Sequence, residues 1–260
     1  MKISQYIRKG RCNMGTWVIG DVHGCYDEFI EMVNRIEKLD KSPTFILIGD
    51  IEDRGPKSRE MMDWAVENVT DNGKFQMVLG NHEDNNITSF ESALDIIERY
   101  GENKESAIVD RYLYSRYNLE EEFVGVTLAE FEKYIDFFKS LPLYKEIQIK
   151  GKKYIIAHAW YSEMKDRRTI INFRDVKKGQ QRVGYRQMNG EILIHGHTPT
   201  IMEHCTQFNA EAGKIWDKGK SVNIDCGLAY RVTLPDHPKC KHGNLAAYRL
   251  EDRRVLYLYE

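Results

Sequence analysis

Short apolar runs alternate with helical patterns through the first third of the chain. The runs Thr16–Ile19, Thr44–Ile48 and Phe75–Leu79 are predominantly apolar, which is typical of buried strands. Between them, Tyr26–Lys38 and residues 56–69 carry apolar residues at the i, i+3, i+4, i+7 spacing of an amphipathic helix. This alternation predicts a parallel sheet built with right-handed crossovers.

Each of these runs is followed by glycine and then by residues that can bind a metal ion. The endings are GDVHG at 20–24, GDIEDRGP at 49–56 and GNHE at 80–83. The carboxyl ends of parallel strands meet at one edge of a sheet, where open α/β sheets bind their ligands. Asp21 and His23 could offer an oxygen and a nitrogen to one metal, but alone they could equally be a helix cap and a loop histidine. Three such endings in order favour a shared functional site.

Two further histidine motifs follow, AHA at 157–159 and HGHT at 195–198. Together the five motifs resemble, in order, those of the phosphoprotein phosphatase (PPP) family of calcineurin-like metallophosphoesterases, from about Gly15 to the chain end. GDVHG and VLGNH are similar to its branch of symmetrical diadenosine tetraphosphatases, whereas HGHTP looks like bacterial Ser/Thr protein phosphatases. The resemblance implies an α/β fold, the calcineurin-like metallophosphoesterase sandwich of two packed mixed β-sheets flanked by helices, with a helical insertion.

The resemblance also implies a centre of two divalent metal ions. A carboxylate shared by both ions holds them about 3.5–4 Å apart, where they activate a bridging water and clamp phosphoryl oxygens. Oxygen and nitrogen ligands without thiolate suit manganese, with iron or zinc as alternatives. The implied ligands are Asp21 and His23 for the first ion, Asp50 as the bridge, and Asn81, His158 and His197 for the second ion.

Three residues beside these ligands match catalytic positions of the family. By resemblance, His82 protonates the leaving oxygen, Asp53 orients His82, and Arg54 holds the phosphate. An imidazole with a carboxylate partner is a suitable general acid near neutral pH, and a guanidinium fits phosphoryl oxygens. The alternative for Arg54 is a loop salt bridge with Asp53, and the two roles are compatible.

The chain departs from the family pattern near the site. Leu79 stands where many protein phosphatases of the family carry arginine, so one phosphate contact is missing or comes from another residue, for which Arg174 is the candidate. Trp160 follows the AHA motif where glycine is common, and would narrow or shield the site. Asp225, in NIDCG at 223–227, is expected to stabilise a turn beneath the metals rather than to act in catalysis.

The rest of the chain divides into a helical part and a strand-rich part. Residues 84–140 lack strand patterns and are expected to form a helical insertion, with a capping-box pattern at Thr127 and Glu130. Residues 1–13 are basic and are expected to extend from a single domain spanning residues 1–260. A second sheet is predicted from strand patterns at 144–149, 153–157, 191–194, 221–225, 244–250 and 255–259.

Composition narrows the choice of partners and compartment. Lysine plus arginine total 38 against 40 aspartate plus glutamate, so the formal net charge is −2. This balance gives no electrostatic reason to expect duplex nucleic acid or a membrane surface as a partner. The five cysteines are scattered, which fits a reducing cytoplasm. His237, Cys240 and His242 could bind a third metal, but they lack the four-ligand spacing of a zinc site, so a polar surface loop is the preferred interpretation.

The five motifs and the family that they resemble imply a phosphatase that acts by attack of a metal-bridging hydroxide. Because Asp53 is present where the diadenosine tetraphosphatase branch often lacks it, phosphoserine and phosphothreonine in proteins rank first as substrates, and symmetrical diadenosine tetraphosphate or another nucleotide phosphoester is the alternative. A third hypothesis is an inactive metal-binding scaffold that recruits partners through Tyr112, Tyr114 and Tyr117. The complete set of ligand and catalytic residue types disfavours this hypothesis.

Overall fold

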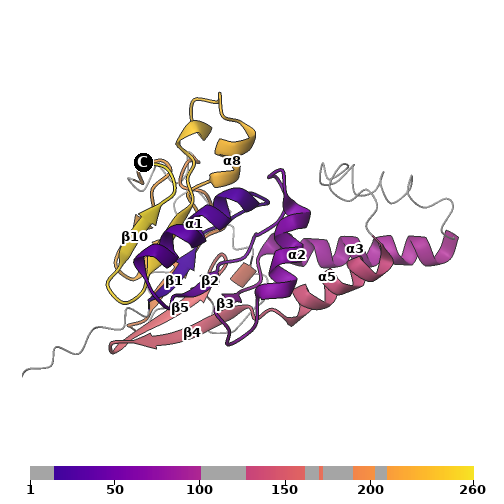
Figure 1. Ribbon diagram of the computed structural model, residues 1–260, viewed down its shortest axis with the longest axis horizontal. Helices are drawn as coiled ribbons and strands as arrows, with labels where there is room; N and C mark the ends of the chain where they lie inside the picture. The colour runs from indigo at the N-terminus through magenta and orange to yellow at the C-terminus, as the bar shows by residue number, and fades with distance from the viewer. Residues whose placement is uncertain (1–14, 101–126, 162–169, 172–189, 203–209) are drawn as a thin grey trace, which may run out of the picture.

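The computed structural model describes residues 15–100, 127–161, 170–171, 190–202 and 210–260. They form two β-sheets with helices packed around them (Figure 1). The strands are β1 (Thr16–Ile19), β2 (Thr44–Leu47), β3 (Phe75–Met77), β4 (Tyr144–Ile149), β5 (Lys152–Ala157), β6 (Ile192–His195), β7 (Trp216–Asp217), β8 (Ser221–Asn223), β9 (Ala246–Arg249) and β10 (Arg254–Tyr257).

The first sheet confirms the predicted parallel arrangement. Its order is β10–β9–β1–β2–β3, and β1, β2 and β3 run parallel, with Thr16 opposite Thr44 and Phe45 opposite Phe75. The segments predicted at 244–250 and 255–259 belong to this sheet and not to the second one, because β9 pairs with β1 and β10 pairs with β9. These antiparallel strands extend the sheet on the β1 side and make it a mixed sheet. Because β1 to β3 share one direction, residues 20–24, 49–56 and 80–83 emerge at the same edge.

The second sheet delivers the remaining histidine motifs. Its order is β4–β5–β6–β8–β7, with β5, β6 and β8 parallel and with β4 and β7 antiparallel at its two edges. His158 directly follows β5, and His197 lies two residues beyond β6. Both sheets therefore contribute side chains from the carboxyl ends of their parallel strands, as the sequence predicts.

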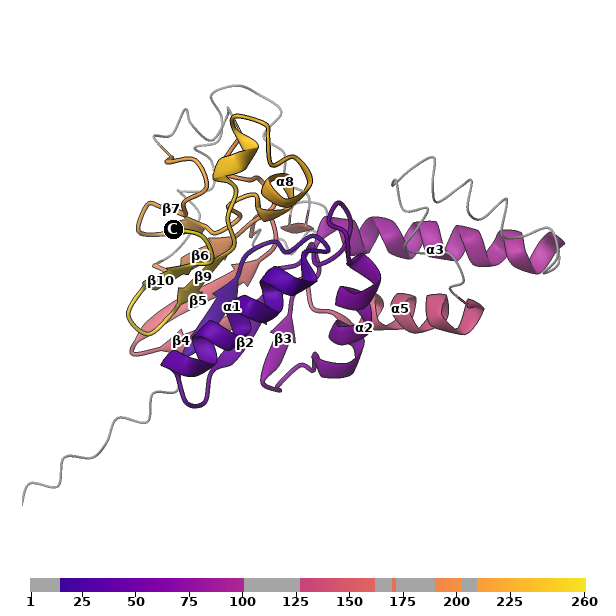
Figure 2. The same cartoon turned by 45° about the horizontal axis from the view of Figure 1, so that its top comes forward.

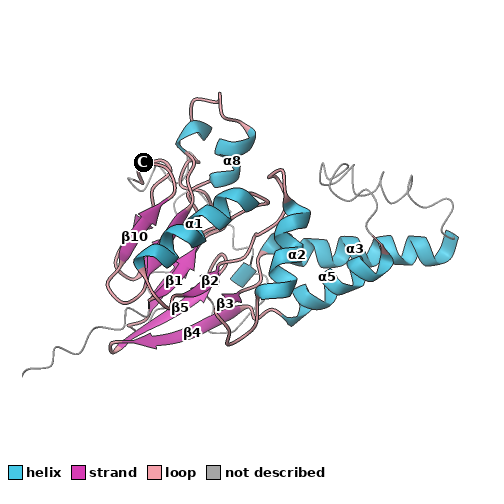
Figure 3. Ribbon diagram, in the orientation of Figure 1, coloured by secondary structure: helices cyan, strands magenta, loops and turns pink. Residues whose placement is uncertain are grey.

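Alternating side chains on the strands fill separate apolar layers. In β5, Ile156 faces the layer between the sheets, whereas Ile155 faces the helices outside, as expected for the two-residue period of a strand. Helix α1 (Tyr26–Leu39) packs on the first sheet, with Phe29, Met32 and Ile36 buried as the stripe predicts. Figure 3 shows the helices outside the two layers of strands, which confirms the predicted sandwich. The other helices are α2 (Ser58–Asn68), α3 (Asn81–Tyr100), α5 (Leu128–Ser140), α8 (Leu228–Thr233) and the short 3₁₀ helix η3 (Cys240–His242).

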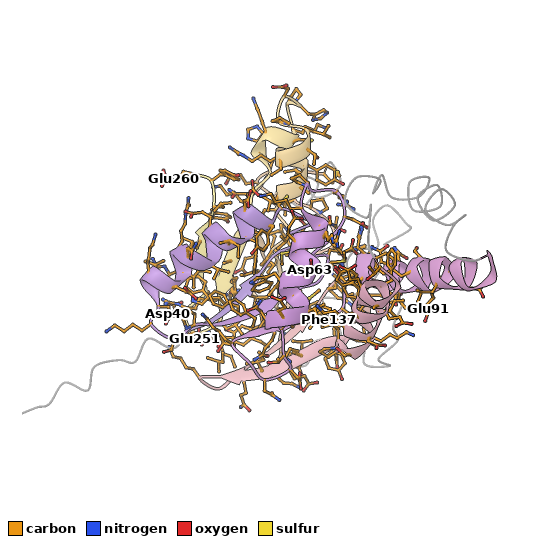
Figure 4. The ribbon with its side chains drawn as sticks, turned by 45° about the vertical axis from the view of Figure 1, so that its right-hand side comes forward. Asp40, Asp63, Glu91, Phe137, Glu251 and Glu260 are labelled. Atoms are coloured by element: carbon orange, nitrogen blue, oxygen red, sulfur yellow. The ribbon has the colours of Figure 1, made fainter. Side chains whose placement is uncertain are left out.

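The described ends of the predicted insertion are helical. Helices α3 and α5 lie side by side and extend away from the sheets (Figure 2). The Thr127 hydroxyl accepts a hydrogen bond from the Glu130 amide, and the Glu130 carboxylate accepts one from the Thr127 amide, so the capping box is confirmed. The Tyr134 hydroxyl of α5 donates to Asp63 of α2, labelled in Figure 4, at 2.6 Å. Tyr112, Tyr114 and Tyr117 lie outside the described residues, as do residues 1–13.

Some elements differ from the sequence prediction. Helix α3 begins at Asn81 rather than at 84, so part of the GNHE motif lies in its first turn. Strand β7 and helices α8 and η3 were not predicted, because they are too short to show a period. His237 and His242 are exposed, as a polar surface loop requires, while the Cys240 side chain is buried. Within the described ranges, none of the helices has the length and hydropathy needed to span a membrane.

Candidate metal and phosphate site

The Asp50 carboxylate lies among histidines where the two sheets meet. Asp50 is 2% exposed. Its Oδ2 lies 3.2 Å from Nε2 of His158 and 3.7 Å from Nε2 of His23. Nε2 of His82 is 3.9 Å from the same oxygen. Burial acts to raise the pKa of Asp50, but the surrounding histidines outweigh it and hold the pKa well below its usual range. The buried carboxylate is therefore ionised, as a ligand shared by two cations must be.

Backbone carbonyl groups orient two of these imidazoles. Nδ1 of His23 lies 3.0 Å from the carbonyl oxygen of Glu52, and Nδ1 of His158 lies 2.9 Å from that of Ile48. A carbonyl can only accept, so each Nδ1 carries a proton and each Nε2 faces Asp50. Metal-ligating histidines commonly have such a partner behind the ring. The rings of His23 and His158 are thus aimed at one centre.

Asn81 completes a second group of ligand atoms. Its Oδ1 lies 2.6 Å from Nδ1 of His197 and 3.0 Å from Nε2 of His158. Those two nitrogens are 3.3 Å apart. Asp50, His158 and His197 also form one of the groups whose ligand atoms all lie within 4.8 Å of one another. Four residues that the resemblance assigns to one ion therefore converge.

Asp21 reaches the same region from the end of β1. Its Oδ2 accepts a hydrogen bond from the His197 amide at 3.0 Å, while its Oδ1 is buried without a hydrogen-bond partner. Burial, and then the charge of Asp225, raise the pKa of Asp21 well above its usual range. A buried carboxylate oxygen without a donor is costly unless it receives a proton or a cation. Asp21 therefore fits a metal ligand, although it is not a member of the 4.8 Å groups.

The charge balance of this centre favours cations. Burial alone would lower the pKa of His158, but the Asp50 carboxylate outweighs it and raises that pKa to about 10. The high pKa of His158 shows that this centre attracts positive charge. Divalent ions would supply the same positive charge, and the donors are oxygen and imidazole nitrogen without thiolate. The residues present thus fit a centre of two divalent cations.

Asp53, His82 and Arg54 form a chain beside this centre. Nδ1 of His82 lies 2.6 Å from Oδ2 of Asp53, and Nε2 of His82 lies 3.1 Å from Nη2 of Arg54. Burial would lower the pKa of His82, but the carboxylates of Asp50 and Asp53 outweigh it and raise the pKa. The Asp53 carboxylate fixes the ring with Nε2 toward the site, as a general acid requires.

The loop after β2 holds these groups in an unusual backbone conformation. Asp50, Asp53 and Arg54 have φ angles of 49°, 65° and 71°, in the left-handed region that side chains rarely adopt. Gly55 permits the tight return of this loop, because a Cβ there would collide with the carbonyl oxygen of His23. Backbone strain of this kind persists where surrounding contacts enforce it and is concentrated at functional sites.

Two buried glutamates beside this loop were not identified from the sequence. Glu83 accepts hydrogen bonds from the amides of Gly80, Asp50 and Ile51 at 2.8, 3.0 and 2.8 Å. It thereby ties the start of α3 to the loop after β2. Glu52 is fully buried beside this network, and burial followed by the charge of neighbouring Asp53 raises its pKa well above the usual range. The only sequence signal was their position inside the GDIEDRGP and GNHE motifs.

The departures from the family pattern have different structural outcomes. Asp225 Oδ1 accepts a hydrogen bond from the Gly227 amide at 2.9 Å, which agrees with the expected turn. Trp160 is partly buried, and its ring packs edge-on against the ring of His195, the first residue of the HGHT motif, with 6.0 Å between the ring centres. Leu79 is 1% exposed and packs in the apolar layer beneath α3 and α5. Arg174 lies outside the described residues.

Leu79→Arg is expected to destabilise the protein rather than improve phosphate binding. A guanidinium would have to enter the apolar layer that Leu79 shares with Phe131 and Ile155. An unpaired buried charge should lower the free energy of unfolding by on the order of 3 kcal/mol, whereas Leu79→Met should cost less than about 1.5 kcal/mol. Urea denaturation measures both variants. Unchanged stability together with a lower KM would instead mean that the arginine reaches the site.

Fold and site together define a class of protein, the metallophosphoesterases. The sequence of this chain matches the calcineurin-like phosphoesterase family over residues 14–225. The chain belongs to this family, which confirms the resemblance seen in its motifs.

Individual relatives are similar over a limited segment. The chain is 44% identical over 70 residues to the symmetrical bis(5'-nucleosyl)-tetraphosphatase of Citrobacter koseri, which covers 27% of this chain and 24% of that protein. It is 40% identical over 79 residues to the enzyme of the same name from Buchnera aphidicola, which covers 30% of this chain and 27% of that protein. The chain thus spans about a quarter of the length of these relatives. A crystal structure of a candidate diadenosine tetraphosphatase has the same fold, with a TM-score of 0.59 at 14% identity over 95% of this chain and 94% of that one.

Proposed function

We propose that this protein is a two-metal phosphoester hydrolase that acts on dinucleoside polyphosphates such as symmetrical diadenosine tetraphosphate. The convergence of His23, Asp50, Asn81, His158 and His197 on one buried centre carries the reaction type. The relatives reported above support the substrate class, because both are named symmetrical tetraphosphatases. This reverses the order of substrates that the sequence alone favours.

The metal ligands in this proposal are Asp21, His23, Asp50, Asn81, His158 and His197, and the ions are manganese, with iron or zinc as alternatives. When bound, two such ions supply a water nucleophile at neutral pH and stabilise charge on the phosphoryl group. Arg54 then binds phosphoryl oxygens through its planar guanidinium. A cytoplasmic location is part of the proposal, and the free, buried Cys25, Cys226 and Cys240 support it.

One observation supports a second substrate class, phosphate monoesters such as phosphoserine and phosphothreonine in proteins. The 2.6 Å contact between Asp53 and His82 provides an acid for the leaving group. An alkoxide is strongly basic and needs that proton, whereas a nucleoside diphosphate leaves as a weak base. The same dyad would therefore contribute more to monoester hydrolysis than to cleavage of a polyphosphate chain.

A side-by-side assay tests the two classes. The Mn²⁺-loaded protein is given diadenosine tetraphosphate and a panel of phosphoserine and phosphothreonine peptides, and kcat/KM is compared. We expect the larger kcat/KM with the dinucleotide and ADP as the sole nucleotide product. A larger value with a phosphopeptide would favour the second class, and formation of ATP with AMP would contradict symmetrical cleavage. Activity on neither class would contradict the proposed function.

A further inference from the structure

The Arg54 side chain is exposed and has two contacts among the described residues. Its Nη2 lies 3.1 Å from Nε2 of His82, and its guanidinium carbon lies 5.4 Å from the centre of the Tyr230 ring. These contacts place the guanidinium beside the His82 ring, at the edge of the proposed metal centre, and beside the Tyr230 ring of a distant segment. Of the two contacts, only the one with Tyr230 involves a residue outside the motifs that supply the proposed ligands and the proposed acid.

The fold fixes Tyr230 independently of Arg54. Tyr230 lies on α8, whose preceding residue Gly227 has a φ of 77° and donates its amide to Asp225. Leu228 and Ala229 bury the inner side of this short helix in the core of the first sheet. The next residue of α8, Arg231, donates a hydrogen bond from Nη1 to the carbonyl oxygen of Lys241 at 2.7 Å. These contacts hold α8, and with it Tyr230, in place beside the exposed Arg54 guanidinium.

We propose that Tyr230 is a positioning residue for phosphate binding, whose ring face holds the Arg54 guanidinium toward the phosphoryl group. The face of an aromatic ring attracts a cation within about 6 Å of its centre, more strongly where water is excluded. Substrate covering Arg54 would exclude water there. This inference rests on the proposed role of Arg54 and adds a residue to it from a distant part of the chain.

Binding of inorganic phosphate to the Mn²⁺-loaded protein, measured by calorimetry, tests the role of Tyr230 without assuming a substrate. Tyr230→Leu should weaken phosphate binding by at least threefold and up to about thirtyfold, the range of a cation–π contact. Tyr230→Phe keeps the ring and should bind within about twofold of the wild type. In the Arg54→Ala background, Tyr230→Leu should have no further effect. In steady-state assays, Tyr230→Leu should raise KM more than it lowers kcat.

Tyr259→Leu is the matched control, because it removes a comparable contact of the same helix: the guanidinium carbon of Arg231 lies 4.0 Å from the centre of the Tyr259 ring. It should leave phosphate binding unchanged. If Tyr259→Leu weakens phosphate binding as much as Tyr230→Leu does, movement of α8 explains the effect. If Tyr230→Phe weakens it as much as Tyr230→Leu does, the aromatic ring is not what positions Arg54. Either result overturns the proposal. If Arg54→Ala weakens binding and Tyr230→Leu does not, only the Tyr230 inference fails. If Arg54→Ala binds phosphate like the wild type, the proposed role of Arg54 fails with it.

Discussion

Asp50→Asn is expected to remove most of the bound metal and to lower kcat/KM for phosphoester hydrolysis by more than about a hundredfold. Loss of a hydrogen-bond partner behind a metal ligand typically costs 10–100-fold, and Asp50 is proposed to bind both ions directly. Asparagine has nearly the same shape and can still accept the hydrogen bond that Asp50 Oδ1 receives from the His82 amide at 3.0 Å. The substitution therefore removes charge with little change in packing. Elemental analysis and kcat/KM measure the two effects.

Asp40→Asn provides the control for this experiment. Asp40 is also buried, at 1% exposure, but it lies near the amino ends of the strands, where its Oδ2 accepts from the Trp17 indole at 3.1 Å (Figure 4). Its loss of charge should leave metal content and turnover unchanged. Full metal content and normal turnover in Asp50→Asn would contradict the shared-ligand assignment. A similar metal loss in both variants would point to a general effect on the fold.

The sequence was most informative where elements are long or regularly patterned. Helix α1 was predictable because its buried stripe has the helical period. Strands β1, β2 and β3 were predictable because each apolar run is followed by glycine and then by polar residues. The start of α3 at Asn81 was hidden, since the GNHE motif reads as the end of a strand rather than as a helix beginning. Helix α8 has six residues and buries two of them, so it shows no period.

The sequence singled out residues that the structure brings together, but it could not predict how they are arranged. The motifs and the family resemblance indicated His23, Asp50 and His158, but the carbonyl groups behind the two rings come from Glu52 and Ile48 through the meeting of two sheets. Backbone carbonyls carry no residue signature, so no spacing rule could reveal these partners. The contact of Arg54 with Tyr230 joins distant segments in the same way.

Removal of the proposed general acid should depend on the leaving group. His82→Ala is expected to lower kcat/KM by about 10²–10⁴-fold with a phosphoserine peptide, the usual contribution of general acid catalysis, because the serine alkoxide needs a proton. With p-nitrophenyl phosphate or diadenosine tetraphosphate the loss should be much smaller, because nitrophenolate and ADP leave as weak bases. Asp53→Asn should follow the same pattern more mildly, since it removes the charge that holds Nδ1 of His82 at 2.6 Å. The comparison uses kcat/KM, so that slow product release does not mask the chemical step.

Metal content must be measured in the same His82→Ala protein, because Nε2 of His82 lies 3.9 Å from the Asp50 carboxylate. With both metals retained, a loss confined to the peptide assigns proton donation to His82. Equal losses on all three substrates with metals intact would mean that His82 orients the substrate or stabilises charge, and the acid assignment would fail. Loss of metal would instead place His82 among the ligands, as the grouping of His23, Asp50 and His82 within 4.8 Å allows. The size of the peptide-specific loss also bears on the natural substrate, because an acid dyad contributes most where the leaving group is an alkoxide.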